Sequence, residues 1–264
     1  TIYPGVPAMY NAINNNPDVQ AGKYDLSSIK VCISGSAPLM RETKMRFEEI
    51  TGAVVAEGYG LSEAPVASHC NPILGLNKTG SIGMPFPDVD CKIISLDDEV
   101  TEMPAGEIGE LTLKGPMVMK GYHNMPTETA NTLRNGWLYT GDMARFDEDG
   151  FIWLVDRKKD LVISGGENIY PREIEEFLFT HPDIQDAKVI GVPDEKYGEE
   201  VCAWIQLRQG SDLDEGAIRA FCKDHIAYFK VPRYIRLVDD FPMTVTGKVQ
   251  KFRMREIMVE ELGL

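Results

Sequence analysis

The sequence has 264 residues, 43% of them hydrophobic, so the chain can bury a core and form more than one domain. Its 41 acidic residues outnumber the 27 basic ones, and the formal net charge is −14 at pH 7. An acidic chain repels nucleic acid and anionic membrane surfaces, so we expect neither as a partner. An anionic ligand would have to be held by local positive groups.

Cysteine and histidine usage argues against disulfides and zinc. The five cysteines are scattered and form no Cys-x-x-Cys pair, and the four histidines show no ligand spacing. We therefore expect a cytoplasmic protein in a reducing compartment. No apolar run approaches the 18 or so residues of a membrane-spanning helix. The first residue is Thr rather than Met, which indicates a fragment or a processed product.

The first part of the chain, residues 1–79, has an α/β pattern. Apolar runs at 29–33 and 54–56 predict two strands, and the segment between them has the apolar spacing of a helix. A strand–helix–strand sequence predicts a parallel pair with ligand-binding turns at the carboxyl ends of the strands. Residues 35–38 (Gly-Ser-Ala-Pro) and 57–60 (Glu-Gly-Tyr-Gly) are the two expected turns.

Residues 80–156 have a different sequence pattern, in which short runs typical of β-strands alternate with Gly and Pro turns. The runs lie at 91–95, 110–113 and 151–155, and 147–150 (Asp-Glu-Asp-Gly) is typical of a hairpin connection. The pattern predicts a small β-barrel or sandwich subdomain.

A polar joint then leads into a new domain. The charged tract 156–160 suits a linker, and the apolar run 161–163 ends in Ser164 and paired glycines, which allow close backbone approach. Pro171 stands where a helix accepts proline at its first position. The apolar face of that helix is formed by Ile174, Phe177 and Leu178.

The remaining chain predicts a compact α+β unit. Strands are expected at 187–192, 201–207 and 234–238, and a helix from a Ser211 cap to about Ile226. Apolar and polar residues alternate along 201–207, which predicts a half-buried strand. A loop at 242–248 precedes a C-terminal helix.

Four segments carry a resemblance to a known family. They are 59–63 (Tyr-Gly-Leu-Ser-Glu), 139–142 (Tyr-Thr-Gly-Asp), 156–175 and 246–248 (Thr-Gly-Lys). The chain resembles the adenylate-forming enzymes, above all the acyl-CoA synthetases that act on fatty or aryl acids. The resemblance covers nearly the whole chain, and the motifs stand in the family's order.

The resemblance implies a domain organisation. Residues 1–156 would be the C-terminal part of a large domain, with an α/β part at 1–79 and the β-barrel at 80–156. Residues 157–264 would be a small mobile domain with its hinge at 157–160. The family's Gly-rich phosphate loop is not in the sequence, so we expect the C-terminal portion of a longer enzyme.

The resemblance also implies roles for the first motif. Tyr59 would contact adenine, Ser62 a phosphate, and Glu63 would bind Mg²⁺, a cation that prefers oxygen ligands. The flanking Gly58 and Gly60 would belong to the same nucleotide site. On the residues alone, a strand end with a surface glutamate fits as well. A second group, Gly35, Ser36 and Ala37, would line the adenine pocket, or form only a strand-to-helix turn.

Two residues are expected at the ribose and one at the reacting phosphate. The Asp142 carboxylate can accept two hydrogen bonds from a ribose diol, although Asp after Gly is also a routine turn residue. The resemblance favours the ribose role and makes Arg157 the second ribose contact. Lys248, otherwise a solvated lysine, would stabilise the charge that develops when a carboxylate attacks the α-phosphate.

The joint and the glycine turn complete the set of expected site residues. In relatives the backbone at Gly165 and Gly166 borders the pantetheine tunnel of CoA. Asn168 matches a polar position near the adenylation site. Lys159 would be the pivot about which the C-terminal domain rotates between the two half-reactions.

The resulting prediction is an ATP-dependent ligase that joins a carboxylic acid, with a fatty acid favoured, to CoA. The acid would form an acyl-adenylate with MgATP, and the CoA thiol would then displace AMP. ATP, Mg²⁺ and CoA are the expected cofactor and co-substrates. A non-catalytic nucleotide-binding or interaction fragment remains open, as does adenylation for another acceptor, such as luciferase-like chemistry or a carrier protein.

Overall fold

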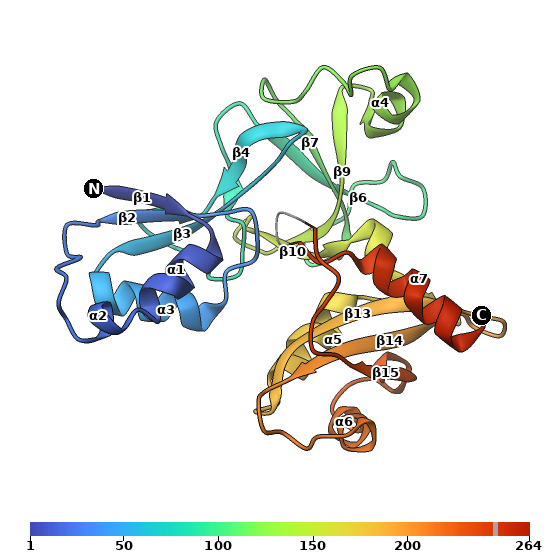
Figure 1. Cartoon of the computed structure of the whole chain (residues 1–264). Coiled ribbons are helices and arrows are strands. Elements are labelled where there is room, and N and C mark those ends of the chain that lie inside the picture. The colour runs from blue at the N-terminus through green and yellow to red at the C-terminus, as the bar shows by residue number, and fades with distance from the viewer. Residues whose placement is uncertain (245–247) are drawn as a thin grey trace. The chain divides into compact units, whose positions relative to one another are not determined.

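The computed structural model describes residues 1–244 and 248–264, which form two compact units, Thr1–Leu154 and Val155–Leu264 (Figure 1). Strand β10 (Ile152–Arg157) crosses this division and also contains the boundary expected after residue 156. Across the described residues, no helix has both the length and the hydropathy that crossing a membrane requires.

The first unit begins with a mixed five-stranded sheet in the order β1-β2-β3-β4-β5. Its strands are β1 (Ile2–Gly5), β2 (Val31–Ser34), β3 (Val54–Leu61), β4 (Ala64–Cys70) and β5 (Met84–Pro85). Its helices are α1 (Pro7–Asn14), α2 (Pro17–Gln20) and α3 (Arg41–Thr51). The expected parallel pair is confirmed as β2 and β3, and α3 connects them. Tyr10 and Phe47 pack from the helices onto Cys32 and Val55 of the sheet.

The second of the two expected glycine turns is wrong. Residues 57–60 continue β3 as a strand, with Tyr59 paired to His69 of β4. The antiparallel partner β4, which the sequence pattern did not reveal, supplies the hydrogen bonds that extend β3. A Cβ atom on Gly60 would lie 2.3 Å from the carbonyl oxygen of Val66, so the crossing of the two strands requires glycine there.

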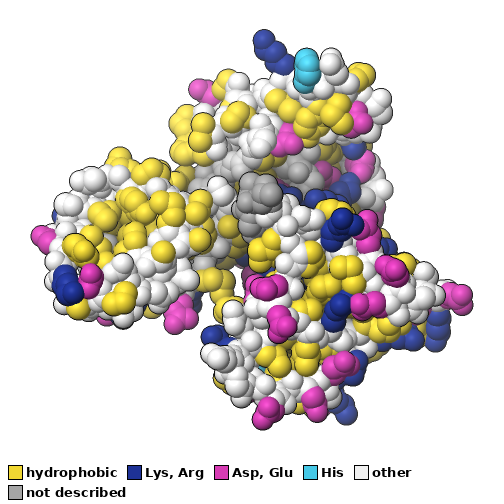
Figure 2. All heavy atoms as spheres, in the orientation of Figure 1, with side chains coloured by type: hydrophobic (Ala, Val, Ile, Leu, Met, Phe, Trp, Pro, Cys, Tyr) yellow, Lys and Arg dark blue, Asp and Glu magenta, His cyan; other side chains and the backbone are white. Residues whose placement is uncertain are grey.

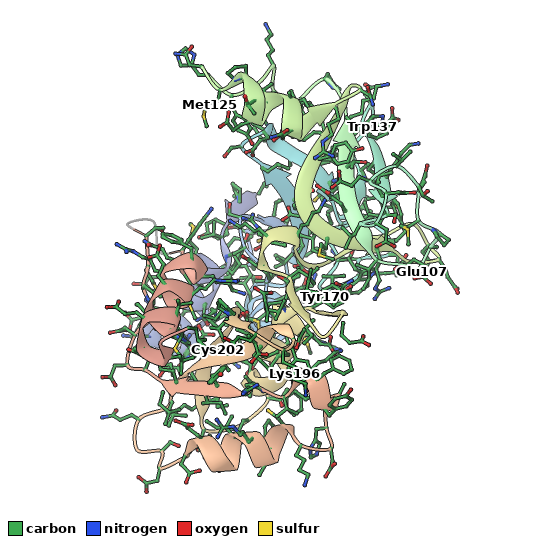
Figure 3. The ribbon with its side chains drawn as sticks, turned by 90° about the vertical axis from the view of Figure 1, so that its right-hand side faces the viewer. Glu107, Met125, Trp137, Tyr170, Lys196 and Cys202 are labelled. Carbon is green, nitrogen blue, oxygen red and sulfur yellow. The ribbon has the colours of Figure 1, made fainter. Side chains whose placement is uncertain are left out.

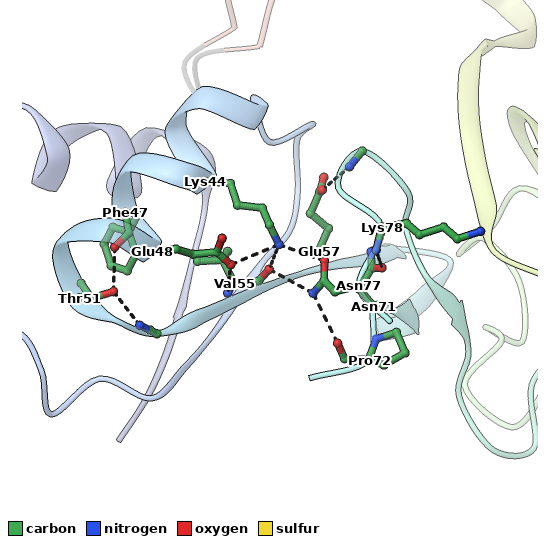
Figure 4. Close-up of polar contacts among 12 residues, drawn as sticks. Lys44, Phe47, Glu48, Thr51, Val55, Glu57, Asn71, Pro72, Asn77 and Lys78 are labelled. Carbon is green, nitrogen blue, oxygen red and sulfur yellow. Dashed lines mark hydrogen bonds and ion pairs between the residues drawn. The ribbon is translucent and has the colours of Figure 1, made fainter. Parts of the chain in front are cut away.

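The loop that follows β4 and contains Asn77 is held by a buried lysine, Lys44 of α3 (Figure 4). Its Nζ donates to the carbonyl oxygen of Val55 and to Asn77 Oδ1 at 3.0 Å, and lies 3.4 Å from Glu48 Oε1. Glu48 Oε1 also accepts from the Val55 amide at 2.9 Å. One ammonium group therefore joins helix, strand and loop.

We expect Lys44→Met to lower the free energy of unfolding of this unit by about 1–3 kcal/mol, because it removes a buried charged donor from the Val55 carbonyl oxygen and from Asn77 and leaves the 30% exposed Glu48 carboxylate without its cation. Urea unfolding would measure the change. Lys23→Met is the matched control, since the Lys23–Asp18 pair is 63% and 46% exposed and should contribute under about 1 kcal/mol. A Lys44 variant as stable as this control would contradict the assigned role.

A second sheet completes the first unit, with the path β10-β9-β7-β6 and β8 paired to β9. Its other elements are β6 (Asp90–Ile94), β7 (Gly109–Lys114), β8 (Leu133–Arg134), β9 (Trp137–Phe146) and α4 (Pro126–Thr132). The hairpin expected at 147–150 is confirmed between β9 and β10, where Asp147 Oδ1 accepts from the amides of Asp149 and Phe151. The path has two ends, so the described strands form an open sheet and not a closed barrel. Closing a barrel would require the tilt and stagger of all its strands to match.

Apolar side chains remain exposed at the edge of the first sheet. Ile2, Val6 and Met9 are 65%, 36% and 43% exposed. They belong to the patch of hydrophobic side chains that Figure 2 shows over β1 and α1. Strand β1 is the end strand of its sheet, so the described residues leave this edge uncovered.

The second unit is an α+β fold around a sheet with the path β12-β11-β14-β13, in which β15 also pairs with β14. Its strands are β11 (Val162–Ser164), β12 (Glu167–Ile169), β13 (Ile184–Asp194), β14 (Gly198–Leu207) and β15 (Tyr234–Leu237). Its helices are α5 (Pro171–Phe179), α6 (Glu215–Cys222) and α7 (Lys251–Leu262), with 3-10 turns at Lys158–Asp160 and Tyr228–Lys230.

Both faces of this sheet are buried, so the half-buried strand expected at 201–207 is wrong. Val201, Ala203 and Ile205 pack with residues of α5 and α6. Cys202, labelled in Figure 3, and Trp204 pack with Met254 and Met258 of α7. The C-terminal helix therefore covers the face that the alternating pattern assigned to solvent.

The expected Ser211 cap is also wrong. Asp214 caps α6 instead, with its Oδ1 accepting from the Ala217 amide at 2.8 Å. Ser211 Oγ accepts from the Leu213 amide within the preceding turn. The helix ends at Cys222, short of Ile226, and Lys223 at its end has an extended backbone.

Candidate active site

Tyr59 and Asp142, which are 83 residues apart in the sequence, meet in the first unit. The Tyr59 hydroxyl donates a 2.6 Å hydrogen bond to Asp142 Oδ2. Both residues are nearly buried, at 9% and 8% exposure. Charge-assisted O–H···O⁻ bonds in a low-dielectric interior are strong. The first two sequence motifs therefore form one continuous polar site.

A bulge in β9 sets the direction in which the Asp142 side chain points. The pairing of β7 with β9 shifts register between Glu110 and Thr112, so that residues 140–142 lie opposite a single residue. Gly141 has φ of +72°, a left-handed conformation that favours glycine, and its amide donates to Glu110 Oε1 at 3.0 Å. The Asp142 amide donates to Thr140 Oγ1. Bulges of this kind redirect side chains at functional sites.

The small-residue turn after β2 lies beside β3, the strand that carries Tyr59. A Cβ on Gly35 would be 3.4 Å from the carbonyl oxygen of Gly58, so the two backbones are in contact. Ser36, with φ of +70°, and Ala37 are exposed beyond the carboxyl end of β2. This confirms the expected strand-end turn. Its contact with a ligand stays a prediction.

Ser62 and Glu63 form the turn between β3 and β4, at the end of the strand that carries Tyr59. Ser62 is exposed and Glu63 is half-buried. The Tyr122 hydroxyl donates to Glu63 Oε1 at 2.7 Å, and the Met119 amide donates to the Glu63 carbonyl oxygen at 2.8 Å. Sequence reasoning missed Tyr122, because nothing in its spacing connects it to a residue 59 positions earlier.

A buried histidine lies behind Tyr59 and was also missed. His69 is fully buried on β4, and its ring centroid is 5.9 Å from that of Tyr59. Its Nδ1 is 2.8 Å from Ser68 Oγ. Burial lowers the pKa of His69 to about 4, so the ring is neutral at pH 7 and packs as an uncharged group.

The described residues hold no preformed metal cage, since within 1–244 and 248–264 no group of three or more His, Cys, Asp or Glu side chains is placed to bind an ion. Mg²⁺ is, however, commonly held by one or two carboxylates together with substrate phosphates and water. The half-buried Glu63, which follows the exposed Ser62 in the turn between β3 and β4, fits that mode.

The joint lies in the second unit. Arg157 is exposed at the end of β10, and Lys159 is exposed within the 3-10 turn Lys158–Asp160. The joint is anchored at its start, because Asp156 accepts from the amides of Arg157 and Arg172, each at 2.8 Å, and so ties β10 to the first turn of α5. Burial raises the pKa of Asp156.

Gly165 and Gly166 form a two-residue hairpin turn between β11 and β12, with φ of +59° and +88°. Strands joined in this way need left-handed residues at the turn. The helix expected from Pro171 is confirmed as α5, and the short strand β12 between the glycines and this helix was not predicted. Asn168 is exposed on β12 opposite Ile163.

Lys248 is exposed in the loop before α7. Its amide donates to Thr244 Oγ1 at 3.1 Å, and the Thr244 amide donates to the Lys248 carbonyl oxygen at 2.8 Å. The backbone on both sides of the loop is thereby paired. The Thr246 and Gly247 part of this motif lies outside the described residues.

Two family models match the chain. The model of the AMP-binding enzyme matches residues 1–123, and the model of the AMP-binding enzyme C-terminal domain matches residues 173–248. The chain belongs to the AMP-binding, or adenylate-forming, enzymes.

Individual relatives include a long-chain-fatty-acid–CoA ligase of Bacillus subtilis (strain 168), 49% identical over 97% of this chain and 45% of the relative. Among solved structures, ATP-bound MatB from Rhodopseudomonas palustris has a TM-score of 0.89 at 34% identity, covering 99% of this chain and 51% of that one. The anthranilate CoA ligase AuaEII in complex with anthranoyl-AMP has a TM-score of 0.82 at 32% identity, covering 100% and 51%. The chain thus spans about half the length of the relatives it matches.

Proposed function

We propose that this chain forms the C-terminal half of an ATP-dependent acid–CoA ligase that acts on a fatty acid. The acid carboxylate attacks the α-phosphorus of ATP, giving an acyl-adenylate and pyrophosphate. The thiol of CoA then attacks the acyl carbon, forming the thioester and releasing AMP. The observation that carries the proposal is the buried Tyr59–Asp142 hydrogen bond, which joins two nucleotide motifs in one site.

The proposed roles follow from the chemistry of each group. Asp142 accepts hydrogen bonds from the ribose diol, and the Tyr59 ring borders the adenine. Ser62 donates to a phosphate oxygen. Glu63 would hold Mg²⁺, which supplies charge neutralisation on the phosphates when it is bound. Lys248 stabilises the charge that develops on the phosphoryl oxygens.

The remaining assignments complete the proposal. Arg157 would be the second ribose contact, and the Gly165–Gly166 turn would border the pantetheine arm of CoA. All five cysteines are free thiols. A reducing compartment suits free thiols, and we place the protein in the cytoplasm.

A panel of carboxylic acids tests the reaction in a full-length enzyme that carries this chain. Acid-dependent pyrophosphate exchange reports adenylation, and CoA-dependent AMP release reports thioester formation. The proposal expects both, with fatty acids preferred. If pyrophosphate exchange occurs but the acyl-adenylate is transferred to another acceptor and not to CoA, the protein is a different ligase. The absence of pyrophosphate exchange with every acid would refute adenylation.

Asp142→Ala should weaken AMP binding by about 10- to 150-fold, the range for loss of a hydrogen bond to a charged group. Isothermal titration calorimetry with AMP and 2′-deoxy-AMP would measure it. The unaltered protein should prefer AMP, and the variant should lose most of that preference, with any remainder due to the second ribose contact at Arg157. Asp149→Ala is the control, because Asp149 is a 62% exposed partner of Lys78. A variant that kept the preference for AMP would exclude Asp142 from the ribose site.

A further inference from the structure

The carboxylate proposed to face Mg²⁺ is fixed by a segment that has no part in the four sequence motifs. Glu63 is held twice by the stretch that follows β7. The Met119 amide binds its carbonyl oxygen at 2.8 Å, and the Tyr122 hydroxyl binds its Oε1 at 2.7 Å. Backbone and side chain are both tied, so the turn after β3 is positioned from outside its own hairpin.

Tyr122 is in turn held by α4. Its amide donates to Thr129 Oγ1 at 2.9 Å, and that hydroxyl donates to the Met125 carbonyl oxygen at 2.8 Å. The preceding Gly121 has φ of +147°, and a Cβ there would lie 2.8 Å from Thr129 Cγ2. Glycine thus lets the loop approach the helix closely enough for the Tyr122 amide to reach Thr129. A chain of contacts runs from α4 through Thr129 and Tyr122 to Glu63.

The chemistry of the donor matters for what Glu63 can bind. An arginine or lysine partner would fix the carboxylate but neutralise its charge. A tyrosine hydroxyl is a neutral donor, so it fixes the carboxylate without adding a positive charge. A tyrosine donor therefore orders Glu63 in advance without competing with a divalent cation for the carboxylate.

We propose that Tyr122 is a positioning residue that orients the Glu63 carboxylate toward the cation of the bound MgATP. The inference rests on the proposed function and deepens it. Ordering a glutamate side chain costs rotamer freedom, and a partner that orders it before the cation arrives removes that cost from binding.

The test compares Tyr122→Phe with the unaltered residue in a full-length enzyme that carries this chain. Calorimetry would measure ATP affinity with and without Mg²⁺, and pyrophosphate exchange would be followed against free Mg²⁺. The variant should need about 10-fold more Mg²⁺ for half-maximal exchange, the scale of one hydrogen bond to a charged group. Its Mg²⁺-free ATP affinity and its melting temperature should stay unchanged.

Two further variants separate positioning from general damage. Tyr139→Phe is the matched control, because the Tyr139 hydroxyl donates to a backbone carbonyl, that of Glu99 at 3.1 Å, and its loss should leave the Mg²⁺ dependence unchanged. Glu63→Gln completes a double-mutant cycle. If Tyr122 acts through Glu63, the double variant should behave like Glu63→Gln alone.

The outcomes are distinguishable. Additive effects in the cycle, or a Tyr122→Phe enzyme with an unaltered Mg²⁺ dependence, would overturn the positioning role while leaving the ligase proposal intact. An unaltered enzyme whose nucleotide binding and exchange show no response to Mg²⁺ would overturn the role of Glu63 and, with it, this inference.

Discussion

Lys248→Ala is expected to slow acyl-adenylate formation by about 10²–10³-fold in a full-length enzyme that carries this chain, the scale for loss of one transition-state donor. Attack by the carboxylate moves negative charge onto the phosphoryl oxygens, and a mobile ammonium group stabilises that charge. Lys248 is exposed, and its hydrogen bonds to Thr244 use its backbone, so removal of the side chain leaves both bonds in place.

Two assays measure the half-reactions separately. Acid-dependent pyrophosphate exchange should fall, whereas conversion of a purified acyl-adenylate to thioester should proceed at near the normal rate, because its phosphoryl step is already complete. Lys223→Ala, another exposed lysine in the same unit, is the control. An equal loss in both assays would show that Lys248 supports the fold or substrate binding rather than adenylation.

Lys159→Pro is expected to have the opposite effect, with adenylation retained and thioester formation lost. Proline fixes its own φ near −65° and disfavours the helical conformation that Lys158 has in the 3-10 turn. If Arg157 to Asp160 is the hinge, the joint should lose one of its two working arrangements. We expect pyrophosphate exchange to persist and thioester formation to fall by roughly 5- to 150-fold, the effect of about 1–3 kcal/mol.

Lys159→Ala is the matched control, because it removes the charge and leaves the backbone free. Lys159 is exposed, so this variant should retain both activities. Circular dichroism and melting temperature would verify folding of the proline variant. Unchanged CoA-dependent turnover in a folded Lys159→Pro enzyme would show that residues 157–160 do not act as the hinge.

Most of the local elements could be predicted from the sequence, because they depend on neighbours in the chain. Apolar runs predicted β2, β13, β14 and β15, and Pro171 predicted the first residue of α5. Gly52, with φ of +69°, ends α3 as a left-handed cap. The Asp147 turn was predictable for the same reason, since its hydrogen bonds join residues within four positions.

Elements that depend on a distant partner were predicted less well. Residues 58–60 are a strand because β4 pairs with this part of β3, and 201–205 is buried on both faces because α7 returns to cover Cys202 and Trp204. The periodicity of apolar residues along a segment indicates which of its faces can be buried. It carries no information on whether a second layer arrives from farther along the chain.

The sequence by itself determined which residues are candidates for the nucleotide site, because Tyr59, Glu63 and Asp142 stand in motifs that resemble those of a known family and follow its order. Only the tertiary structure decided how they are joined. The Tyr59–Asp142 bond spans 83 residues and the Tyr122–Glu63 bond spans 59. Each depends on a bulge or loop that turns one side chain toward another, and the direction of a side chain is fixed by three-dimensional packing rather than by its distance along the chain.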